Sequence, residues 1–377
     1  MTNTRLLQVE RDTFESYLPA LAKALSARPL AELESRNSDA LALFKQHDGP
    51  ALIFPVELGG LGASALDATR VYRALGALSP SLGAGTTMHQ LSVAALLTHA
   101  RAAGSEADLE LYRGVAAGRL LLSSGFSEGQ PGGTVFKPTV LARPVEGGYL
   151  VTGRKQPCSL ARSMDLLTAS VAEDRGDRAR RGVIVIPADS PGISVEPFWD
   201  NPILAAAESD AVVLTDVFVP ENLLLWSDEA DPDGQFEQHG YIWFGLLISA
   251  TYLGAASAVV ERLLLSGKAD AATYTVAACE LEASMAALEG IACAFDAGDR
   301  STELSARMLF CREALKGALH RAVIAAMDGL GGISFIKNPE VTYLASAVHA
   351  AGFHPPSKRA TADTLLNYHA TGVFGMS

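Results

Sequence analysis

The spacing of apolar residues predicts that the first 120 residues are mostly helical. Several segments carry apolar side chains at intervals of three and four residues, as one face of a helix does: FESYLPALAKALSA, SDALALFKQ, LDATRVYRALGAL, HQLSVAALLTHARAAG and EADLELYRGVAAG. The glycines of PVELGGLGAS predict a tight turn with positive φ angles or close backbone approach. The segment SLGAG, just before His89, is expected to be a loop. Residues 1–120 are therefore expected to form an N-terminal helical domain.

The pattern changes near Leu121, where short apolar runs begin to alternate with turns. The runs are TVLARPV, GGYLVTGRK, DLLTASVAE, RGVIVIPA, ISVEPF and AVVLTDVFVP. Strands at this spacing, with no helical pattern between them, predict an antiparallel β-barrel or sandwich over residues 121–228. No GxGxxG follows a strand, so a Rossmann nucleotide site is not expected.

After the acidic linker SDEADPDGQ the chain returns to helix. The long, alanine-rich segments that follow predict a C-terminal four-helix bundle over 236–377: Tyr241–Gly267, Ala271–Gly298, Ser301–Met327 and Thr342–Ala351. The fold class is thus α+β multidomain, with helices, then strands, then helices. Tyr241–Val260 contains no charged residue and has the length of a membrane span. Its polar residues and the lack of basic flanking residues favour a helix buried at the centre of the bundle.

Composition excludes several kinds of partner. The chain has 377 residues, with 30 Lys and Arg against 42 Asp and Glu, a net charge of −12. Nucleic acid and anionic membranes both require clustered basic residues, so neither is expected as a partner. The four cysteines show no CxxC spacing and no zinc pattern, so we expect no metal site and a reducing compartment. The first residues carry no apolar export signal, so a cytoplasmic protein is expected.

The order of these regions, with particular residues at their joins, resembles the acyl-CoA dehydrogenase superfamily of flavoproteins. The resemblance runs from about Pro55 to Ala370. FPVELGGLGAS is similar to the family's Pro-Glu-x-x-Gly-Gly-x-Gly turn, and SGFSEGQPGG to its Ser/Thr-Glu-x-x-x-Gly segment. The other similar segments are GGYLVTGRKQPCSLARSMD, IPADSPGISVEPFW, DVFVPENLL and GLGGISF. Each is a weak signal alone, but together and in the right order they are specific.

The resemblance implies FAD bound between the β domain and the C-terminal bundle, completed by a partner subunit and facing an acyl thioester. By their place in the motifs, Phe126 and Ser127 would bond the pyrimidine side of the flavin. Ser159 would approach the flavin N5, and Pro157 stands where an aromatic residue often covers the ring. A hydroxyl at N5 would assist as that atom gains hydride.

Two positions that hold a catalytic carboxylate in relatives hold other residues here. Dehydrogenation of a thioester needs a base for the α-proton, and a buried carboxylate suits this. One such position corresponds to His354 and the other to about Phe244, which cannot take a proton. His354 is the candidate base, or it hydrogen-bonds the substrate, or it merely precedes Pro355 in a turn. His89 and Phe244 are candidate residues of the substrate pocket.

The cofactor motifs also depart from the family. Many relatives carry Arg-x-x-Phe-Gly between bundle helices, where the arginine binds the FAD pyrophosphate. The corresponding SGKADAATYTVAACELEASM has no arginine, and Asp328 replaces a glutamine. Gly331 and Gly332 remain and would allow close backbone approach to the cofactor. FAD would then bind weakly, bind through other groups, or be replaced by a diffusible flavin.

The sequence therefore leaves three functions open. The first is a flavin-dependent α,β-dehydrogenase of acyl-CoA or acyl-carrier-protein thioesters, with an electron-acceptor flavoprotein as partner. The second is a two-component monooxygenase on the same fold, supplied by a flavin reductase. It needs no α-carbon base and tolerates weak flavin binding. The third is a non-catalytic subunit that pairs with an active homologue. A homodimer or homotetramer is expected for the first two.

Overall fold

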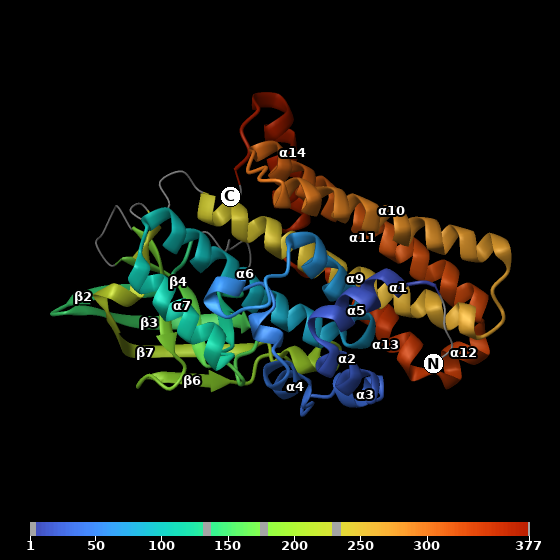
Figure 1. Cartoon of the computed structure of the whole chain (residues 1–377), viewed down its shortest axis with the longest axis horizontal. Helices are drawn as coiled ribbons and strands as arrows, with labels where there is room; N and C mark the ends of the chain where they lie inside the picture. The colour runs from blue at the N-terminus through green and yellow to red at the C-terminus, as the bar shows by residue number, and fades with distance from the viewer. Residues whose placement is uncertain (1–4, 131–136, 174–179, 228–234, 376–377) are drawn as a thin grey trace.

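The computed structural model describes residues 5–130, 137–173, 180–227 and 235–375. In Figure 1 the strands lie at one end, the C-terminal helices extend to the other end, and the N-terminal helices lie between and below them. The predicted order of helices, strands and helices is confirmed. Part of the SGFSEGQPGG motif and most of the acidic linker lie outside the described residues.

The N-terminal helices follow the predicted apolar pattern, with two differences at their starts. They are α1 (Gln8–Tyr17), α2 (Pro19–Ser26), α3 (Leu30–Leu33), α4 (Ala40–Gln46), α5 (Ala65–Leu78), α6 (Pro80–Ala103) and α7 (Glu106–Gly118). The segment expected as one helix divides into α1 and α2 because Pro19 starts a new helix, where its missing N–H costs nothing. The expectation that SLGAG forms a loop is wrong, because these residues form the first turns of α6. Ser79 caps that helix, and Pro80 occupies its first position.

The structure confirms that PVELGGLGAS forms a turn with positive φ angles and close backbone approach. Gly59 and Gly62 have φ angles of 83° and 65°. A Cβ atom at Gly60 would lie 2.1 Å from the Phe54 carbonyl oxygen, so only glycine fits.

Within the described residues, the middle part forms one sheet of eight strands in the order β6-β7-β3-β2-β4-β5-β8, with β1 paired to β4. The strands are β1 (Leu122–Gly125), β2 (Leu141–Val145), β3 (Gly148–Cys158), β4 (Leu166–Glu173), β5 (Arg181–Pro187), β6 (Ile193–Glu196), β7 (Asp210–Pro220) and β8 (Leu224–Trp226). Most pairings are antiparallel as expected, whereas β4 runs parallel to both β1 and β2.

A buried ion pair joins the loop after β1 to the middle of the sheet. The Lys155 ammonium lies 2.6 Å from the Glu128 carboxylate and donates to the Ser170 hydroxyl at 3.0 Å. The same carboxylate accepts the Thr139 backbone N–H at 2.9 Å. This pair fixes the segment that follows β1, which is where the sequence predicts flavin contacts.

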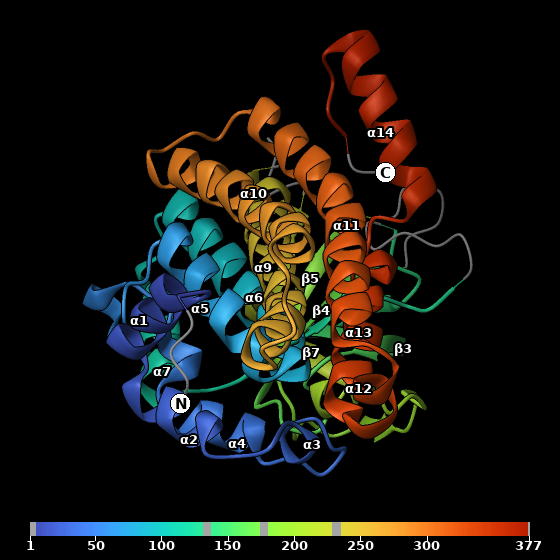
Figure 2. The same cartoon turned by 90° about the vertical axis from the view of Figure 1, so that its right-hand side faces the viewer.

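The C-terminal helices form a bundle around α9 (Gln235–Leu265). The others are α10 (Ala271–Asp296), α11 (Thr302–Leu330), α12 (Gly332–Lys337), α13 (Pro339–His349) and α14 (Lys358–Thr371). Within the described residues, Gln238–Leu265 is long and apolar enough to span a membrane, yet 89% of its most apolar window is buried. The prediction of an internal helix is therefore confirmed. Figure 2 shows α9 between α6 on one side and α10 and α11 on the other, with α14 projecting from the bundle.

Candidate functional site

The two segments that the sequence predicts to contact flavin lie side by side at the end of the sheet. Phe126 and Ser127 follow β1, and Pro157 lies near the end of β3 with Ser159 directly after it. The Gln156 N–H donates to the Ser127 carbonyl oxygen at 2.8 Å and so joins the segments. All four side chains are partly exposed, whereas β1 is wholly buried. The hydroxyls and backbone groups of this ledge fit the polar edge of a flavin ring, with Pro157 as an apolar neighbour.

Ser159 has a hydroxyl partner that sequence reasoning missed. Its Oγ lies 3.0 Å from the Oγ of Ser209, and either atom can donate. Ser123 occupies the other side, since its hydroxyl donates to the Ser159 carbonyl oxygen at 2.5 Å. Ser209 stands in AAAESDAVVL, which matches no motif and carries no periodic signal, so only the folded chain reveals it.

The two loops that carry these serines are joined through their backbones. The Leu160 N–H donates to the Ala207 carbonyl at 3.0 Å, and the Ala161 N–H donates to the Glu208 carbonyl at 3.1 Å. Leu160 and Glu208, which adjoin the two serines, both adopt left-handed backbone, with φ angles of 64° and 52°. Such angles are unfavourable for residues with a Cβ and gather at functional sites, where the surroundings hold them.

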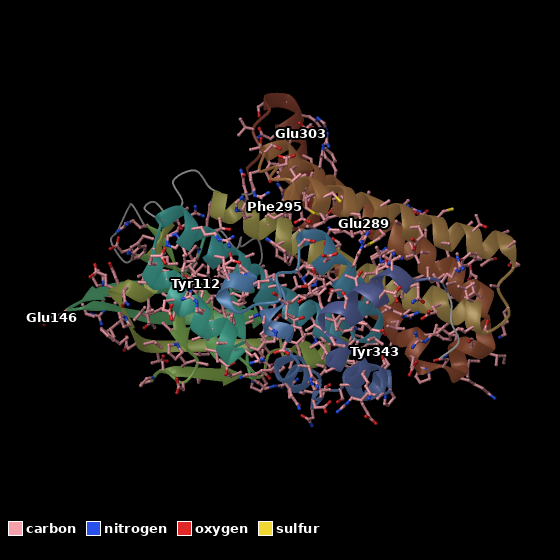
Figure 3. The ribbon with its side chains drawn as sticks, in the orientation of Figure 1. Tyr112, Glu146, Glu289, Phe295, Glu303 and Tyr343 are labelled. Carbon is pink, nitrogen blue, oxygen red and sulfur yellow. The ribbon has the colours of Figure 1, made fainter. Side chains whose placement is uncertain are left out.

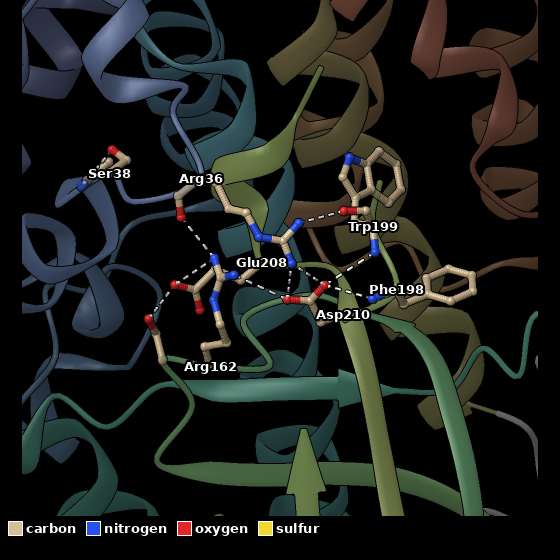
Figure 4. A network of polar contacts seen from close by, with 9 residues as sticks. Arg36, Ser38, Arg162, Phe198, Trp199, Glu208 and Asp210 are labelled. Carbon is tan, nitrogen blue, oxygen red and sulfur yellow. Dashed lines mark hydrogen bonds and ion pairs between the residues drawn. The ribbon is translucent and has the colours of Figure 1, made fainter. Parts of the chain in front are cut away.

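A carboxylate clamp next to Ser209 holds its loop in place (Figure 4). The buried Asp210 carboxylate accepts from the Arg36 guanidinium at 3.2 Å and from the Arg162 guanidinium at 3.3 Å. It also accepts the backbone N–H groups of Phe198 and Trp199 at 3.0 and 3.2 Å. Charge-assisted bonds to a buried carboxylate are among the stronger polar contacts, so the start of β7 is firmly placed.

The structure brings the two expected base positions together. The His354 and Phe244 rings have centroids 6.2 Å apart, and His354 Nε2 shares a hydrogen bond of 2.6 Å with the Tyr252 hydroxyl. The Arg312 guanidinium lies 4.8 Å from the centre of the Phe244 ring. Burial, with help from the positive charges of Arg312 and Lys316, lowers the pKa of His354 to about 3. The imidazole is therefore neutral and a weak base.

The first turns of α6 contact both the serine loops and α9, at Thr251 next to Tyr252. A Cβ atom at Gly83 would lie 2.6 Å from the Thr251 side chain, next to Tyr252. A Cβ atom at Gly85 would lie 3.3 Å from Leu160 and 3.4 Å from Ala207. The two glycines thus let the first turns of α6 approach both groups, which explains why weak helix formers stand there.

His89 has a different role from the one expected. Its Nε2–H donates to the Pro50 carbonyl at 2.9 Å, and its Nδ1 accepts the Leu122 N–H at 3.0 Å. Burial lowers its pKa to about 4. Both ring nitrogens are used within the protein, so His89 ties β1 to the N-terminal helices and has no polar atom left for a substrate.

Gly331 and Gly332 do not meet the other predicted flavin residues within one chain. They lie at the junction of α11 and α12, and Figure 1 shows α12 at the opposite end of the molecule from the sheet. The space around the Cβ positions of both glycines is open to 4 Å.

Glu34 is a buried carboxylate that the sequence analysis did not identify as a candidate site residue. Glu34 accepts hydrogen bonds from the Ser79 and Ser81 hydroxyls at 2.5 Å and from the Tyr343 hydroxyl. Figure 3 shows Tyr343 where α13 meets the N-terminal helices. Burial raises the pKa of Glu34 against the opposing effect of these donors, and its charge contributes to raising the pKa of Tyr252. No sequence pattern marks Glu34, because its donors come from distant segments.

Comparisons with known proteins find similarity in sequence and in fold along nearly the whole chain. The chain is 41% identical over 373 residues to isobutylamine N-hydroxylase of Streptomyces viridifaciens, which covers 98% of this chain and 99% of that protein. The structure matches KijD3 in complex with FMN and dTDP-3-amino-2,3,6-trideoxy-4-keto-3-methyl-D-glucose, with a TM-score of 0.83 and 22% identity over 99% of this chain and 96% of that one.

A second solved structure agrees. FMN-bound TdsC from Paenibacillus sp. A11-2 gives a TM-score of 0.80 at 18% identity, covering 99% of both chains. No model of a known protein family matches the chain.

Proposed function

The chain belongs to the acyl-CoA dehydrogenase superfamily of flavoproteins and is a flavin-dependent oxidoreductase, and we propose that it is a monooxygenase that hydroxylates the nitrogen of a small aliphatic amine. The observation that carries this proposal is the pairing of Phe244 with a neutral His354 where relatives have a carboxylate base. A thioester dehydrogenase must remove a weakly acidic α-proton, and an imidazole with a pKa of about 3 is poorly matched to that task.

Amine hydroxylation does not need such a base, because the nitrogen lone pair is itself the nucleophile. The reaction balances as RNH₂ + reduced flavin + O₂ → RNHOH + oxidised flavin + H₂O. The flavin, when bound, supplies two electrons and activates oxygen. The 41% identity to an amine N-hydroxylase along nearly the whole chain supports this choice of substrate class.

The charges around His354 favour the reactive form of an amine. The nucleophile must be the free base, whereas an aliphatic amine in water is mostly the ammonium ion. Arg312 and Lys316 contribute to lowering the pKa of His354, and they would lower the pKa of an amine bound beside it by the same electrostatic effect. His354, fixed by Tyr252, would orient the amine through a hydrogen bond.

We propose that the ledge of Phe126, Ser127, Pro157 and Ser159 holds a flavin that diffuses from a separate reductase. The missing arginine and the presence of Asp328 argue against a clamp for the FAD pyrophosphate. FMN in the structural neighbours supports reduced FMN as sufficient, with reduced FAD as the alternative to be measured beside it.

We also propose a homo-oligomer. Gly331 and Gly332 lie far from the ledge within one chain, and the residues that follow them in the sequence include exposed apolar side chains. Ile333, Phe335 and Ile336 have exposed fractions of 66%, 54% and 75%. Burying such side chains against a second copy would be favourable. That copy would also bring its glycines toward the flavin, as the family resemblance implies.

The test is a product assay with two arms. In the first, the protein is given a flavin reductase, NADH, FMN or FAD, O₂ and a panel of C3–C5 primary amines, and hydroxylamines are measured by mass spectrometry. In the second, it is incubated anaerobically with oxidised flavin and acyl-CoA thioesters. The proposal predicts hydroxylamine in the first arm and no bleaching of flavin in the second. Bleaching by a thioester without hydroxylamine formation would support dehydrogenation instead.

A further inference from the structure

We propose that Ser209 is a positioning residue that lets the Ser159 hydroxyl change from donor to acceptor as the flavin N5 gains a hydrogen. This inference rests on the proposed function, and on the predicted contact between Ser159 and N5. It concerns a residue outside every motif in the sequence, and its basis is the 3.0 Å separation of the two Oγ atoms.

The two states of flavin differ in the hydrogen count at N5. The oxidised ring nitrogen carries no hydrogen and accepts a hydrogen bond, whereas the reduced N5–H donates one. A serine hydroxyl has one hydrogen and two lone pairs. It can therefore serve both states only if its own hydrogen has another acceptor when N5–H donates to it. Ser209 Oγ is that acceptor, and in the oxidised state it can donate to Ser159 in return.

Another hydroxyl suits this exchange better than a charged or backbone group. A carboxylate would only accept, and an N–H would only donate, so either would favour one state of Ser159. The neighbouring Ser123 does not offer the same exchange, because its hydroxyl donates to the Ser159 backbone carbonyl at 2.5 Å and also lies 3.0 Å from Cys158 Sγ. Ser209 is nearly buried, with 7% of its surface exposed, so water does not readily replace it.

The surrounding frame holds the two hydroxyls at hydrogen-bond distance. Arg36 and Arg162 fix Asp210, which directly follows Ser209. The backbone bonds from Leu160 to Ala207 and from Ala161 to Glu208 join the loops on either side. Two left-handed residues in so small a region indicate that unfavourable backbone angles are held in place to set this geometry.

The measurable consequence is a preference for reduced flavin. Without Ser209, the Ser159 hydroxyl has no acceptor for its hydrogen when N5–H donates to it, whereas in the oxidised state it only loses a donor to one of its two lone pairs. An unmet donor costs more than a free second lone pair, so binding of the reduced form weakens more than binding of the oxidised form. Losing one neutral hydrogen bond predicts a roughly fivefold fall in the ratio of the two affinities. A residue that served only to fold the loop would change both affinities alike.

The experiment is an anaerobic titration of the full-length protein with oxidised and with dithionite-reduced FMN, followed by fluorescence or calorimetry. Ser209→Ala and Ser209→Cys should both lower the preference for reduced FMN, and Ser209→Thr should restore it. Ser163→Ala is the matched control, because that hydroxyl belongs to the loop of Ser159 and donates to the side chain of Glu208, next to Ser209, at 2.9 Å. It should leave the ratio unchanged.

The outcomes separate this inference from the proposed function. If the wild-type protein binds neither form of FMN or FAD, the flavin proposal itself fails. If it prefers the reduced form and Ser209→Ala and Ser209→Cys, shown folded by thermal unfolding, keep the same ratio, the inference about Ser209 is overturned while the monooxygenase proposal stands.

Discussion

At the residue scale, two histidines are held neutral by different surroundings. His354 is half-buried against Phe244 near Arg312 and Lys316, while His89 is buried between backbone groups that use both of its nitrogens. The sequence identified both as candidate site residues, His354 with three alternative roles and His89 as part of the substrate pocket. The difference lies in hydrogen-bond partners from Pro50 and Leu122, which no local pattern around His89 encodes.

His354 should remain neutral across the physiological range. Because its pKa is lowered to about 3, its ring signals in an NMR titration should not shift between about pH 5 and pH 8. His354→Ala should remove turnover with little change in flavin affinity, since the ring is proposed to orient substrate. His349, which is exposed, provides the matched control variant, His349→Ala. A His354 signal that titrates near 6.5, or full turnover in His354→Ala, would remove it from the mechanism.

His89 should make stability depend on acid. A histidine in an unfolded chain has a pKa of about 6.5, while the pKa of His89 in the folded protein is about 4, so the folded state resists protonation. Its contribution is complete above pH 6.5 and is lost as pH falls through 4, on the order of 3 kcal/mol in all. Urea unfolding of wild type and His89→Gln over that range checks this. Gln can copy both hydrogen bonds without titrating, and an equally steep pH dependence in that variant would contradict the assignment.

At the scale of elements, glycine is required where the backbones of two helices approach closely. Helices α5 and α9 cross so closely that a Cβ at Gly254 would lie 2.0 Å from the Arg73 carbonyl oxygen. Near this crossing, Arg73 of α5 donates to the Ser257 hydroxyl of α9 at 3.2 Å and forms a buried ion pair of 2.6 Å with Glu10 of α1. The apolar pattern predicted α9 as an internal helix, but the crossing point depends on which residue of a distant helix faces it.

Gly254→Ala should therefore destabilise the protein although alanine is the better helix former. Displacing a backbone carbonyl predicts a loss of about 3 kcal/mol in the free energy of unfolding. Gly290→Ala in α10 is the control, because open space surrounds its Cβ position. It should be neutral or should stabilise by about 0.5–1 kcal/mol. Equal stability of the two variants in denaturant unfolding would mean that α5 and α9 do not cross this closely.

The sequence predicts the architecture of the whole molecule well and its site only in part. Periodicity separates helices from strands, and the two segments that the motifs predict to contact flavin lie side by side, joined by the bond from Gln156 to Ser127. The parallel pairing of β1 with β4, the partner of Ser159 at Ser209 and the donors around Glu34 all join segments distant in the chain. Such contacts are set by tertiary packing, so one sequence without structure does not contain a visible signal for them.

The central claim is that oxygen from O₂ is transferred to an amine nitrogen. The most direct test is a turnover experiment with a reductase, NADH, flavin and isobutylamine under ¹⁸O₂, with mass analysis of the hydroxylamine. The account predicts one ¹⁸O atom in the product under ¹⁸O₂ and none when the label is in water. Absence of any oxygenated amine, while an acyl thioester is converted to its α,β-unsaturated form, would contradict it.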